Sequence, residues 1–386
     1  YWQSGYGVNC YQRILTKRGA FLFIPRTGSH LFTYRLLKFL CNFLYETPLA
    51  QIKENKMEYR LLGKTGVEVS QLCLGTMPFG GPADEKESAK MFQSCRDVGI
   101  NFFDCANVYE KGRSEKVLGK LMADSRDQLI ITSKAYFPTS DDVVSRGSTR
   151  KHIMTAVGES LKRLKTDYID IYFLHRFDDL TPLEETLRAL EDLVHQGKVR
   201  YLGASNFAAW QVAKGLGVSA KNGWNRFECI QPMYNLVKRQ AEVEILPMAL
   251  SESVGVITYS PLGGGLLSGK YGIKKRPKVG RLMENKMYET RYGGSQIFNI
   301  AEQFSLLSKD QGFSPVSLAV AWVASHPAVT APIIGGRNLK QLKDSLKSVD
   351  VDMTTELKDR ISALSPEPPI ATDRNEEKTK HNYGQR

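Results

Sequence analysis

Short apolar segments alternate with segments of helical periodicity along most of this chain. Segments of strand length lie near residues 71, 101, 129, 169, 199, 229, 256 and 329. Segments in which apolar residues recur every three or four positions lie at 85–97, 115–122, 149–164, 183–195, 208–216, 242–253, 316–324 and 339–347. A strand followed by a helix, repeated in this way, predicts a parallel sheet covered by helices. Because about 310 residues after Met57 suit one barrel with insertions, we predict the α/β class and a (β/α)8 TIM barrel.

Two additions to this repeat are predicted. YRLLGKTGVEVS, at 59–70, has apolar positions on both sides of GKTG and predicts a β-hairpin before the first barrel strand. Residues 263–296 form a long loop after the seventh strand, and such loops are often functional, so this one could close over a bound ligand. We place the barrel domain at 57–365. The polar, Pro-containing residues 366–386 predict a disordered tail, which would lie near the barrel mouth if it were ordered.

Residues 1–56 differ in composition from the rest. They carry eight Lys or Arg against two acidic residues, an excess that is half of the net charge of +12. The basic apolar stretch at 31–45 is too short and interrupted for a membrane span. Three interpretations compete: a transit peptide, an amphipathic helix at a membrane surface, or translation upstream of the true start. We favour the last, because the chain begins with Tyr1 and Met57 directly precedes the first domain-like residues.

Composition favours a cytoplasmic protein that does not bind nucleic acid. The dense basic run is KKRPK, at 274–278, which we interpret as a solvated or phosphate-facing loop. No His or Cys cluster has the spacing of a metal site. Cys105 could sense redox state, but a small buried thiol is the favoured interpretation. The cysteines lack the paired spacing of a disulfide framework, which suits a reducing compartment. They are Cys10, Cys41, Cys73, Cys95, Cys105 and Cys229.

Four polar residues lie at or just after the ends of predicted strands. Asp104 and Tyr109 lie in NFFDCANVY, Lys134 ends LIITSK, and His175 ends IDIYFLH. The C-terminal ends of barrel strands meet at one face, so one site could gather all four. A phenol has a pKa of about 10, and the Lys134 ammonium would ease proton donation by Tyr109. Asp104 would orient Lys134, and His175 could hydrogen-bond a substrate oxygen.

This set suits the reduction of a carbonyl group. The carbonyl oxygen would gain a proton as hydride arrives on carbon. Because no side chain supplies a hydride, the reaction requires a nicotinamide cofactor.

In order, local context and spacing, Asp104, Tyr109, Lys134 and His175 resemble the catalytic tetrad of the aldo-keto reductase superfamily. The resemblance covers roughly residues 57–365. It implies that Tyr109 is the general acid, that Lys134 tunes it, and that the other two support them. It also implies that the hairpin closes the bottom of the barrel. Each residue taken alone could be explained by packing or solvation, but four matches in register favour the site.

Cofactor segments follow in the family's order. Ser205 and Asn206 of GASNF and Gln231 of IQPMYN carry groups that, in the family, grip the nicotinamide amide. Tyr259 begins YSPLGGGLLSGKY and could stack on the nicotinamide ring. Its glycines would let the backbone approach a pyrophosphate, and Lys270 adds a cation. A flexible Gly-rich loop is an equally good interpretation of that segment alone.

APIIGGRNLKQLKDSL, at 331–346, predicts a strand, two glycines and a helix whose first amides would attract a phosphate. Arg337 could grip a ribose 2′-phosphate, which favours NADP(H) over NAD. The next family positions are usually an acidic residue and Asn. Here they are Asp344, a shorter acid that could still reach the adenine, and Ser345, which departs from Asn. No GxGxxG indicates a Rossmann site. By resemblance, the cofactor-binding residues are Gly75, Thr76, Asp104, Ser205, Asn206, Gln231, Tyr259, Ser260, Pro261, Leu262, Gly263, Lys270, Arg281, Gly335, Arg337 and Gln341.

The substrate pocket would be walled by loop residues. Aromatic and Met side chains favour an apolar or aryl carbonyl. Arg176 could recognise a carboxylate or phosphate, but we favour an ion pair with Asp178. The predicted wall residues are Met77, Pro78, Phe79, Tyr136, Phe137, Arg176, Phe177, Tyr288 and Tyr292.

The leading hypothesis is an NADPH-dependent reductase of a small aldehyde or ketone. SPLGGGLLSGKY, at 260–271, also resembles the voltage-gated potassium channel β-subunit branch of the superfamily, which implies an NADPH-binding regulatory subunit as the alternative. A third interpretation, a sugar-phosphate isomerase or lyase, usually needs paired acids or a Schiff-base Lys. It would also leave Ser205, Asn206 and Gln231 without a purpose.

Overall fold

The computed structural model describes residues 11–15, 21–25 and 57–380. The chain divides into two units, Tyr1–Glu54 and Asn55–Arg386. In the first, β1 (Tyr11–Leu15) and β2 (Phe21–Pro25) pair antiparallel. The stretch at 31–45 lies outside the described residues, so the interpretations of 1–56 stay predictions.

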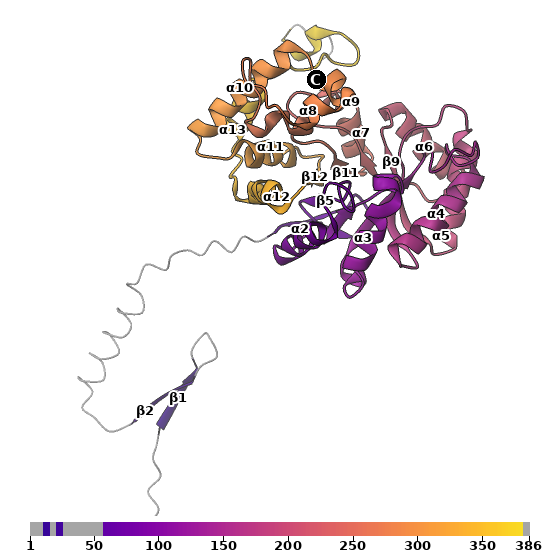
Figure 1. Cartoon of the computed structure of the whole chain (residues 1–386), viewed down its shortest axis with the longest axis horizontal. Coiled ribbons are helices and arrows are strands. Elements are labelled where there is room, and N and C mark those ends of the chain that lie inside the picture. Colours follow the sequence, from indigo (N-terminus) through magenta and orange to yellow (C-terminus); the bar gives the residue numbers. More distant parts are fainter. Residues whose placement is uncertain (1–10, 16–20, 26–56, 381–386) are drawn as a thin grey trace, which may run out of the picture. The chain divides into compact units, whose positions relative to one another are not determined.

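Eight parallel strands of the second unit close into a barrel (Figure 1). Of these eight strands, the last along the chain, β12, pairs with the first, β5, with Ile333 beside Cys73. The barrel therefore leaves no strand edge open. The predicted (β/α)8 barrel is confirmed. Its strands are β5 (Cys73–Gly75), β6 (Phe102–Asp104), β7 (Ile130–Ala135), β8 (Ile169–Leu174), β9 (Val199–Ser205), β10 (Phe227–Gln231), β11 (Gly255–Thr258) and β12 (Ala331–Ile334).

Helices follow each strand and cover the outside of the barrel. They are α2 (Glu85–Asp97), α3 (Arg113–Leu121), α4 (Arg150–Leu164), α5 (Leu183–His195), α6 (Ala209–Asn222), α7 (Ile245–Ser251), α11 (Pro315–Ala324) and α12 (Leu339–Leu346). Asp84, Thr149 and Ser314 begin three of them by accepting a first-turn amide, as N-cap residues do. Helix α6 runs past its predicted end at 216. A Cβ at Gly215 would lie 2.7 Å from the Phe227 ring, so this glycine allows close packing instead of ending the helix.

The predicted hairpin is confirmed as β3 (Tyr59–Leu61) and β4 (Glu68–Ser70). Leu62 and Val69 are fully buried and belong to one apolar cluster with residues inside the barrel. The hairpin therefore packs against the barrel interior. The interior residues of that cluster are Cys73, Phe102, Ile171, Phe173, Cys229, Ile257 and Ala331.

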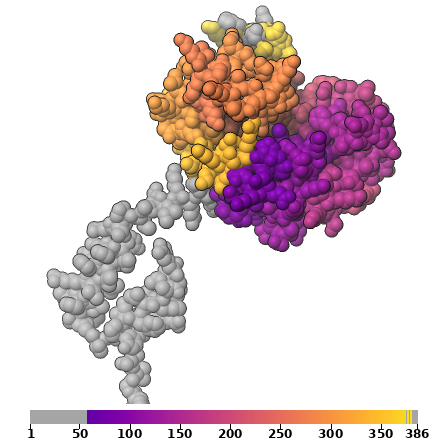
Figure 2. Space-filling view, viewed as in Figure 1, coloured from indigo at the N-terminus to yellow at the C-terminus, as the bar shows by residue number. Residues whose placement is uncertain are grey.

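The long connection after β11 is more helical than predicted. Within 263–296 it forms η4 (Gly263–Ser268), α8 (Arg281–Glu284) and α9 (Lys286–Tyr292). The last of these packs tightly, because a Cβ at Gly264 would lie 2.6 Å from the Tyr288 ring. In Figure 2 the orange segment stands as a lobe beside the indigo and magenta part of the barrel.

The second unit contains further helices outside the strand–helix repeat. Helices α10 (Ser295–Asp310) and α13 (Thr355–Ser362) were not predicted. Beyond 365, residues 366–380 include the short η6 (Asn375–Lys378), and the domain limits at 57 and 365 stay predictions.

The hairpin offers a matched test of its packing. Leu62→Ala should lower the free energy of unfolding by about 2–5 kcal/mol, because it leaves a cavity against the barrel interior. Its neighbour Leu61 is 59% exposed, so Leu61→Ala should stay within about 0.5 kcal/mol of the parent. Urea-unfolding midpoints of the two variants measure both effects. Equal losses would show that the hairpin does not close the barrel.

Candidate active site

The C-terminal ends of the barrel strands open onto a cavity of about 1330 Å³. That is above the range of about 300–1,000 Å³ usual for small-ligand sites. Residues at or just after the ends of several strands line it, among them Gly75, Asp104, His175, Ser205 and Gln231. The cavity can therefore hold a long ligand together with a smaller one.

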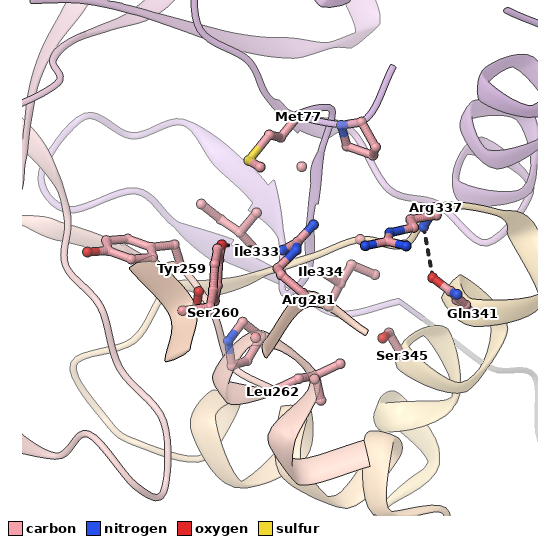
Figure 3. Close-up of a pocket in the computed structure, with 18 of the residues that line it drawn as sticks. Met77, Tyr259, Ser260, Leu262, Arg281, Ile333, Ile334, Arg337, Gln341 and Ser345 are labelled. Carbon is pink, nitrogen blue, oxygen red and sulfur yellow. Dashed lines mark hydrogen bonds between the residues drawn. The ribbon is translucent and has the colours of Figure 1, made fainter. Parts of the chain in front are cut away.

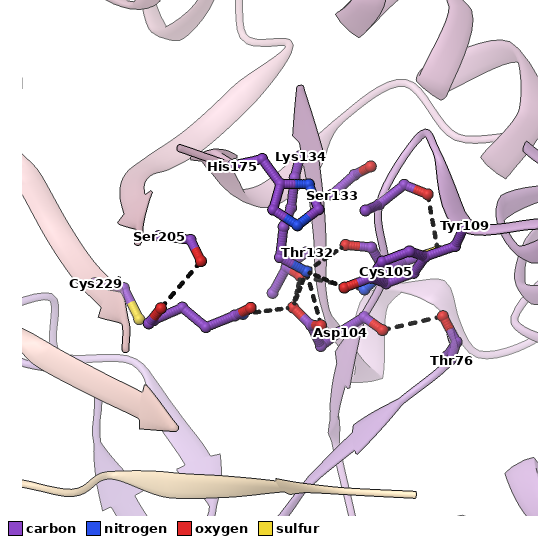
Figure 4. Close-up of polar contacts among 12 residues, drawn as sticks. Thr76, Asp104, Cys105, Tyr109, Thr132, Ser133, Lys134, His175, Ser205 and Cys229 are labelled. Carbon is purple, nitrogen blue, oxygen red and sulfur yellow. Dashed lines mark hydrogen bonds and ion pairs between the residues drawn. The ribbon is translucent and has the colours of Figure 1, made fainter. Parts of the chain in front are cut away.

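The four residues predicted to be catalytic are brought together at the cavity floor (Figure 4). Lys134 is fully buried, and its Nζ donates to both carboxylate oxygens of Asp104 at 2.7 Å and to the Cys105 carbonyl at 2.8 Å. The same Nζ lies 3.3 Å from the Tyr109 hydroxyl. The His175 ring meets the Tyr109 ring edge-on, with centroids 6.1 Å apart. The arrangement places an ammonium beneath a phenol that lines the cavity.

A turn held by unusual backbone angles presents Tyr109. The two residues after it, Glu110 and Lys111, have φ of 49° and 56°, which is uncommon for residues other than glycine. Glu110 pairs with Arg113 at 3.0 Å, and a Cβ at Gly81 would collide with the Glu110 carboxylate. The FGG segment before α2 thus leaves room for the turn.

Burial and charge set the protonation of the site. Burial raises the pKa of Tyr109 above its ordinary value, and the Lys134 charge opposes that rise without cancelling it. Burial lowers the pKa of Lys134, but Asp104 and Tyr109 together raise it by more. The net pKa is therefore above the ordinary value of a lysine, and the amine stays charged. Burial and Lys134 lower the pKa of His175 to about 3. At neutral pH the site holds a protonated phenol, an ammonium and a neutral imidazole. Lys134 acts in the expected direction, because it lowers the pKa of Tyr109, but burial raises that pKa by more.

Asp104 is held by more donors than the sequence indicated. Its Oδ1 also accepts from Thr132 Oγ1 and from Gln231 Nε2, each at 2.8 Å. Its backbone carbonyl accepts from Thr76 Oγ1 at 3.0 Å. Sequence reasoning missed Thr132, although it lies two residues before Lys134 and so on the same face of β7.

A second buried carboxylate supports the opposite face of β7. Glu115 is fully buried; it accepts from Ser133 Oγ and from Arg163 Nε, each at 2.6 Å. These bonds join α3 and α4 to the strand that carries Lys134. Nearby Cys105 is also buried, which raises the pKa of its thiol to about 12, so a reactive thiolate is not available there.

All but two of the predicted cofactor-binding residues line the cavity. The exceptions are Thr76, whose hydroxyl is buried against the Asp104 carbonyl, and Gly263, which is packed beside Tyr292 and Leu266. Those that line it are Gly75, Asp104, Ser205, Asn206, Gln231, Tyr259, Ser260, Pro261, Leu262, Lys270, Arg281, Gly335, Arg337 and Gln341.

The amides predicted to grip a carboxamide are hydrogen bonded to their surroundings. Asn206, with φ of 57°, donates from Nδ2 to the His175 carbonyl at 2.9 Å and accepts from the Tyr259 hydroxyl at 2.7 Å. Ser205 Oγ donates to the Gln231 carbonyl at 3.0 Å. This network ties the predicted nicotinamide region to the loop that carries His175.

The opposite end of the cavity is basic (Figure 3). Arg281 and Arg337 point into it beside Gln341 and Ser345. The Arg337 guanidinium is part-exposed and lies 3.4 Å from the Glu284 carboxylate. Ser345 is fully buried, and its hydroxyl has no hydrogen-bond partner among the described residues. Cations together with an unpartnered hydroxyl fit a phosphate-bearing nucleotide. The sequence showed that Ser345 stands where the family usually has Asn, but it did not place Ser345 in the site.

Five of the nine predicted wall residues line the cavity. Met77, Pro78, Phe137, Arg176 and Tyr288 line the cavity. Four predicted wall residues do not line it, because each packs elsewhere. Phe79 and Tyr292 are fully buried, Phe177 packs on Phe207 at 5.2 Å, and Tyr136 packs edge-on against Phe137 at 5.3 Å. Lining residues that the sequence did not suggest include Val108, Met287 and Arg291.

The favoured ion pair between Arg176 and Asp178 is wrong. The Asp178 carboxylate accepts instead from the backbone amides of Ser148 and Leu180 and from the Thr181 hydroxyl, at 2.7, 3.0 and 2.8 Å. These donors fix the loops after β7 and β8 to each other.

The sequence model of the aldo/keto reductase family matches residues 71–366. This chain belongs to the aldo/keto reductase family. It is 37% identical over 328 residues to "Uncharacterized oxidoreductase YrpG" of Bacillus subtilis (strain 168), across 81% of this chain and 97% of that protein. It is 35% identical over 331 residues to a probable voltage-gated potassium channel subunit beta of Oryza sativa subsp. japonica, across 82% and 99%.

A fungal relative has a named activity. Versiconal hemiacetal acetate reductase of Aspergillus parasiticus is 33% identical over 330 residues, across 78% of this chain and 94% of that protein. The family and these relatives support an oxidoreductase. Across the described part of this aldo/keto reductase, no helix is long and apolar enough to cross a membrane, and no cluster of His, Cys, Asp or Glu could hold a metal.

The buried pair at the centre of this aldo/keto reductase can be tested without any substrate. Lys134→Met should lower the free energy of unfolding by about 3–5 kcal/mol, because it leaves the buried Asp104 carboxylate without a cation. Asp104→Asn should lower it by a similar amount, because it leaves the buried ammonium without a carboxylate. The double variant should cost less than the two losses combined, since neither charge remains. Urea unfolding at pH 7 gives the coupling energy. Additivity within about 0.5 kcal/mol would contradict a coupled pair.

Proposed function

We propose that this aldo/keto reductase reduces aldehydes or ketones with NADPH, with Tyr109 as the proton donor. The observation that carries the proposal is the buried Lys134 ammonium, 2.7 Å from Asp104 and 3.3 Å from the phenol oxygen of Tyr109. This geometry combines a proton donor with a fixed charge that stabilises the donor after the proton has left.

The cavity residues suit that cofactor. Ser205, Asn206 and Gln231 would hold the carboxamide and Tyr259 would lie against the ring, while the basic end would hold the phosphates. Bound NADPH would supply the hydride that no side chain can provide. Arg337 would favour NADPH over NADH through the 2′-phosphate. The helices within 263–296 would then form a clasp over the cofactor.

The side chains would then act on a carbonyl placed beside Tyr109. The raised pKa of Tyr109 keeps its proton in place until the carbonyl oxygen gains negative charge. Lys134 stabilises the phenolate that results, and Asp104 keeps Lys134 charged. His175, neutral at physiological pH, donates a hydrogen bond that helps to orient the carbonyl oxygen.

A regulatory subunit is the second candidate, because of the similarity to the probable potassium channel subunit beta of Oryza sativa. The assembled tetrad favours the reductase. The free, buried cysteines of the described residues support a reducing compartment such as the cytoplasm. Slow turnover with tight retention of NADPH would favour the regulatory subunit.

Tyr109→Phe tests the proton donor. It removes the hydroxyl and keeps the ring, so kcat should fall by about 10²–10⁴-fold. NADPH affinity, measured by the quenching of protein fluorescence, should stay close to that of the parent. The assay follows NADPH absorbance with aryl and aliphatic aldehydes, on protein that begins at Met57. Near-native turnover in the variant would exclude Tyr109 as the acid.

Arg337→Ala tests the cofactor preference. Loss of a charged hydrogen-bond donor should weaken NADPH binding by roughly 10- to 100-fold and NADH binding much less. Arg188, which is exposed on α5 and does not line the cavity, supplies a control. Arg188→Ala should leave both dissociation constants unchanged. Equal losses for the two cofactors would remove the 2′-phosphate role of Arg337.

A further inference from the structure

Arg176 lies beside the predicted catalytic residues, on a backbone segment that hydrogen bonds hold in place. It directly follows His175 at the end of β8 and lines the same cavity as Tyr109. The backbone of His175 is fixed on both sides, because its amide donates to the Ala135 carbonyl at 2.9 Å and its carbonyl accepts from Asn206 at 2.9 Å. The side chain of Arg176 is exposed to the cavity from a rigid attachment point.

The charge of Arg176 is not compensated within the described part of the protein. No described side chain forms an ion pair or hydrogen bond with its guanidinium, and nearby Asp178 is fully engaged by other donors. The acidic residues that line the cavity are Asp104, which pairs with Lys134, and Asp344, which lies on α12. The wall next to His175 therefore carries an unpaired cation.

Arg176 also lies away from the cations suited to cofactor phosphates. Arg337 follows β12, and β8 is four strands away from β12 in the eight-stranded barrel, which is the opposite side of the mouth. Phosphates held near Arg337 and Arg281 leave Arg176 available for another anion. Asp104 of the tetrad ends β6, which is two strands from β12 and two from β8, whereas His175 directly precedes Arg176.

An aromatic ring lies against His175, the residue before Arg176. Phe137 lines the cavity, and its ring packs edge-on against the His175 ring with centroids 4.9 Å apart. The site thus combines an apolar ring with the unpaired guanidinium of Arg176.

We propose that Arg176 binds an oxyanion on the substrate, so that the preferred substrates are apolar or aryl carbonyl compounds that carry a carboxylate or phosphate group. The proposal rests on the proposed reductase function. A guanidinium presents a planar fork of donors that matches either oxyanion. Binding the anion beside His175 would orient the carbonyl toward Tyr109.

Matched substrates test the proposal on the full chain. The values of kcat/KM are compared for 4-carboxybenzaldehyde and its neutral methyl ester, and for 4-formylphenyl phosphate and its neutral dimethyl ester. The parent should prefer the anionic member of at least one pair, and the preferred pair identifies the anion. In Arg176→Gln the ratio of anionic to neutral kcat/KM should fall on the order of tenfold, mainly through KM, since the bond is partly exposed.

Three comparisons separate this role from a structural one. Arg176→Lys should recover part of the ratio, because it restores the charge without the fork. Arg188→Gln, which changes a cation outside the cavity, should keep the parent ratio. The preference of the parent should also shrink as salt rises from about 0.05 M to 1 M, because salt screens exposed charges. A parent that favours the esters, or an unchanged ratio in Arg176→Gln, would overturn the proposal.

The neutral esters keep the two hypotheses apart. Turnover of the esters without any preference for the anions would reject the role of Arg176 and keep the reductase. If no carbonyl is turned over, the reductase fails, and calorimetry of benzoate and phenyl phosphate binding to the NADP-loaded protein decides the anion site. Binding that Arg176→Gln weakens would support the site, and equal binding by the parent and the variant would reject it.

Discussion

The ion pair between Lys134 and Asp104 is the interaction on which the site depends. Removing two charges from water is expensive, and such a pair is stable only when the remaining hydrogen-bonding groups are satisfied. Here Asp104 also accepts from Thr132 and Gln231, and Lys134 also donates to the Cys105 carbonyl. The result is a fixed positive charge beneath Tyr109 that need not reorganise when the charge on the phenol oxygen changes.

The closed barrel is what makes this pair possible. Parallel register places Asp104 of β6 beside Thr132 of β7, and the two-residue period of a strand turns Lys134 to the same face. Gln231 comes from β10, across the barrel, and reaches Asp104 because closure brings distant strands around one interior. On the other face of β7, Glu115 bonds Ser133, so both faces of the strand that carries Lys134 are held by buried carboxylates.

The strand ends that carry chemistry could be predicted from sequence, because each is an apolar run that stops at a polar residue. The sequence could not predict contacts for which several groups compete, such as several donors for one carboxylate. Asp178 has a cation two residues away in sequence, yet backbone amides take its oxygens. Phe79 follows a strand as a wall residue would, but its amide donates to the Thr76 carbonyl at 2.9 Å and the ring turns into the core. The pKa of Tyr109 depends on burial as well as on Lys134, and burial is set by the whole fold.

The distribution of charge around the cavity follows from the same topology. Arg337 lies after β12, and Arg281 lies in the long connection that leads to β12, so both are on the side of the barrel where α12 begins. Arg176 lies after β8, on the opposite side, directly after the neutral His175. In the proposed reductase, a cofactor with phosphates at one end would be drawn to the α12 side by Coulomb attraction. The order of the strands in the barrel thus places Arg337 and Arg281 on one side of the cavity mouth and Arg176 on the other.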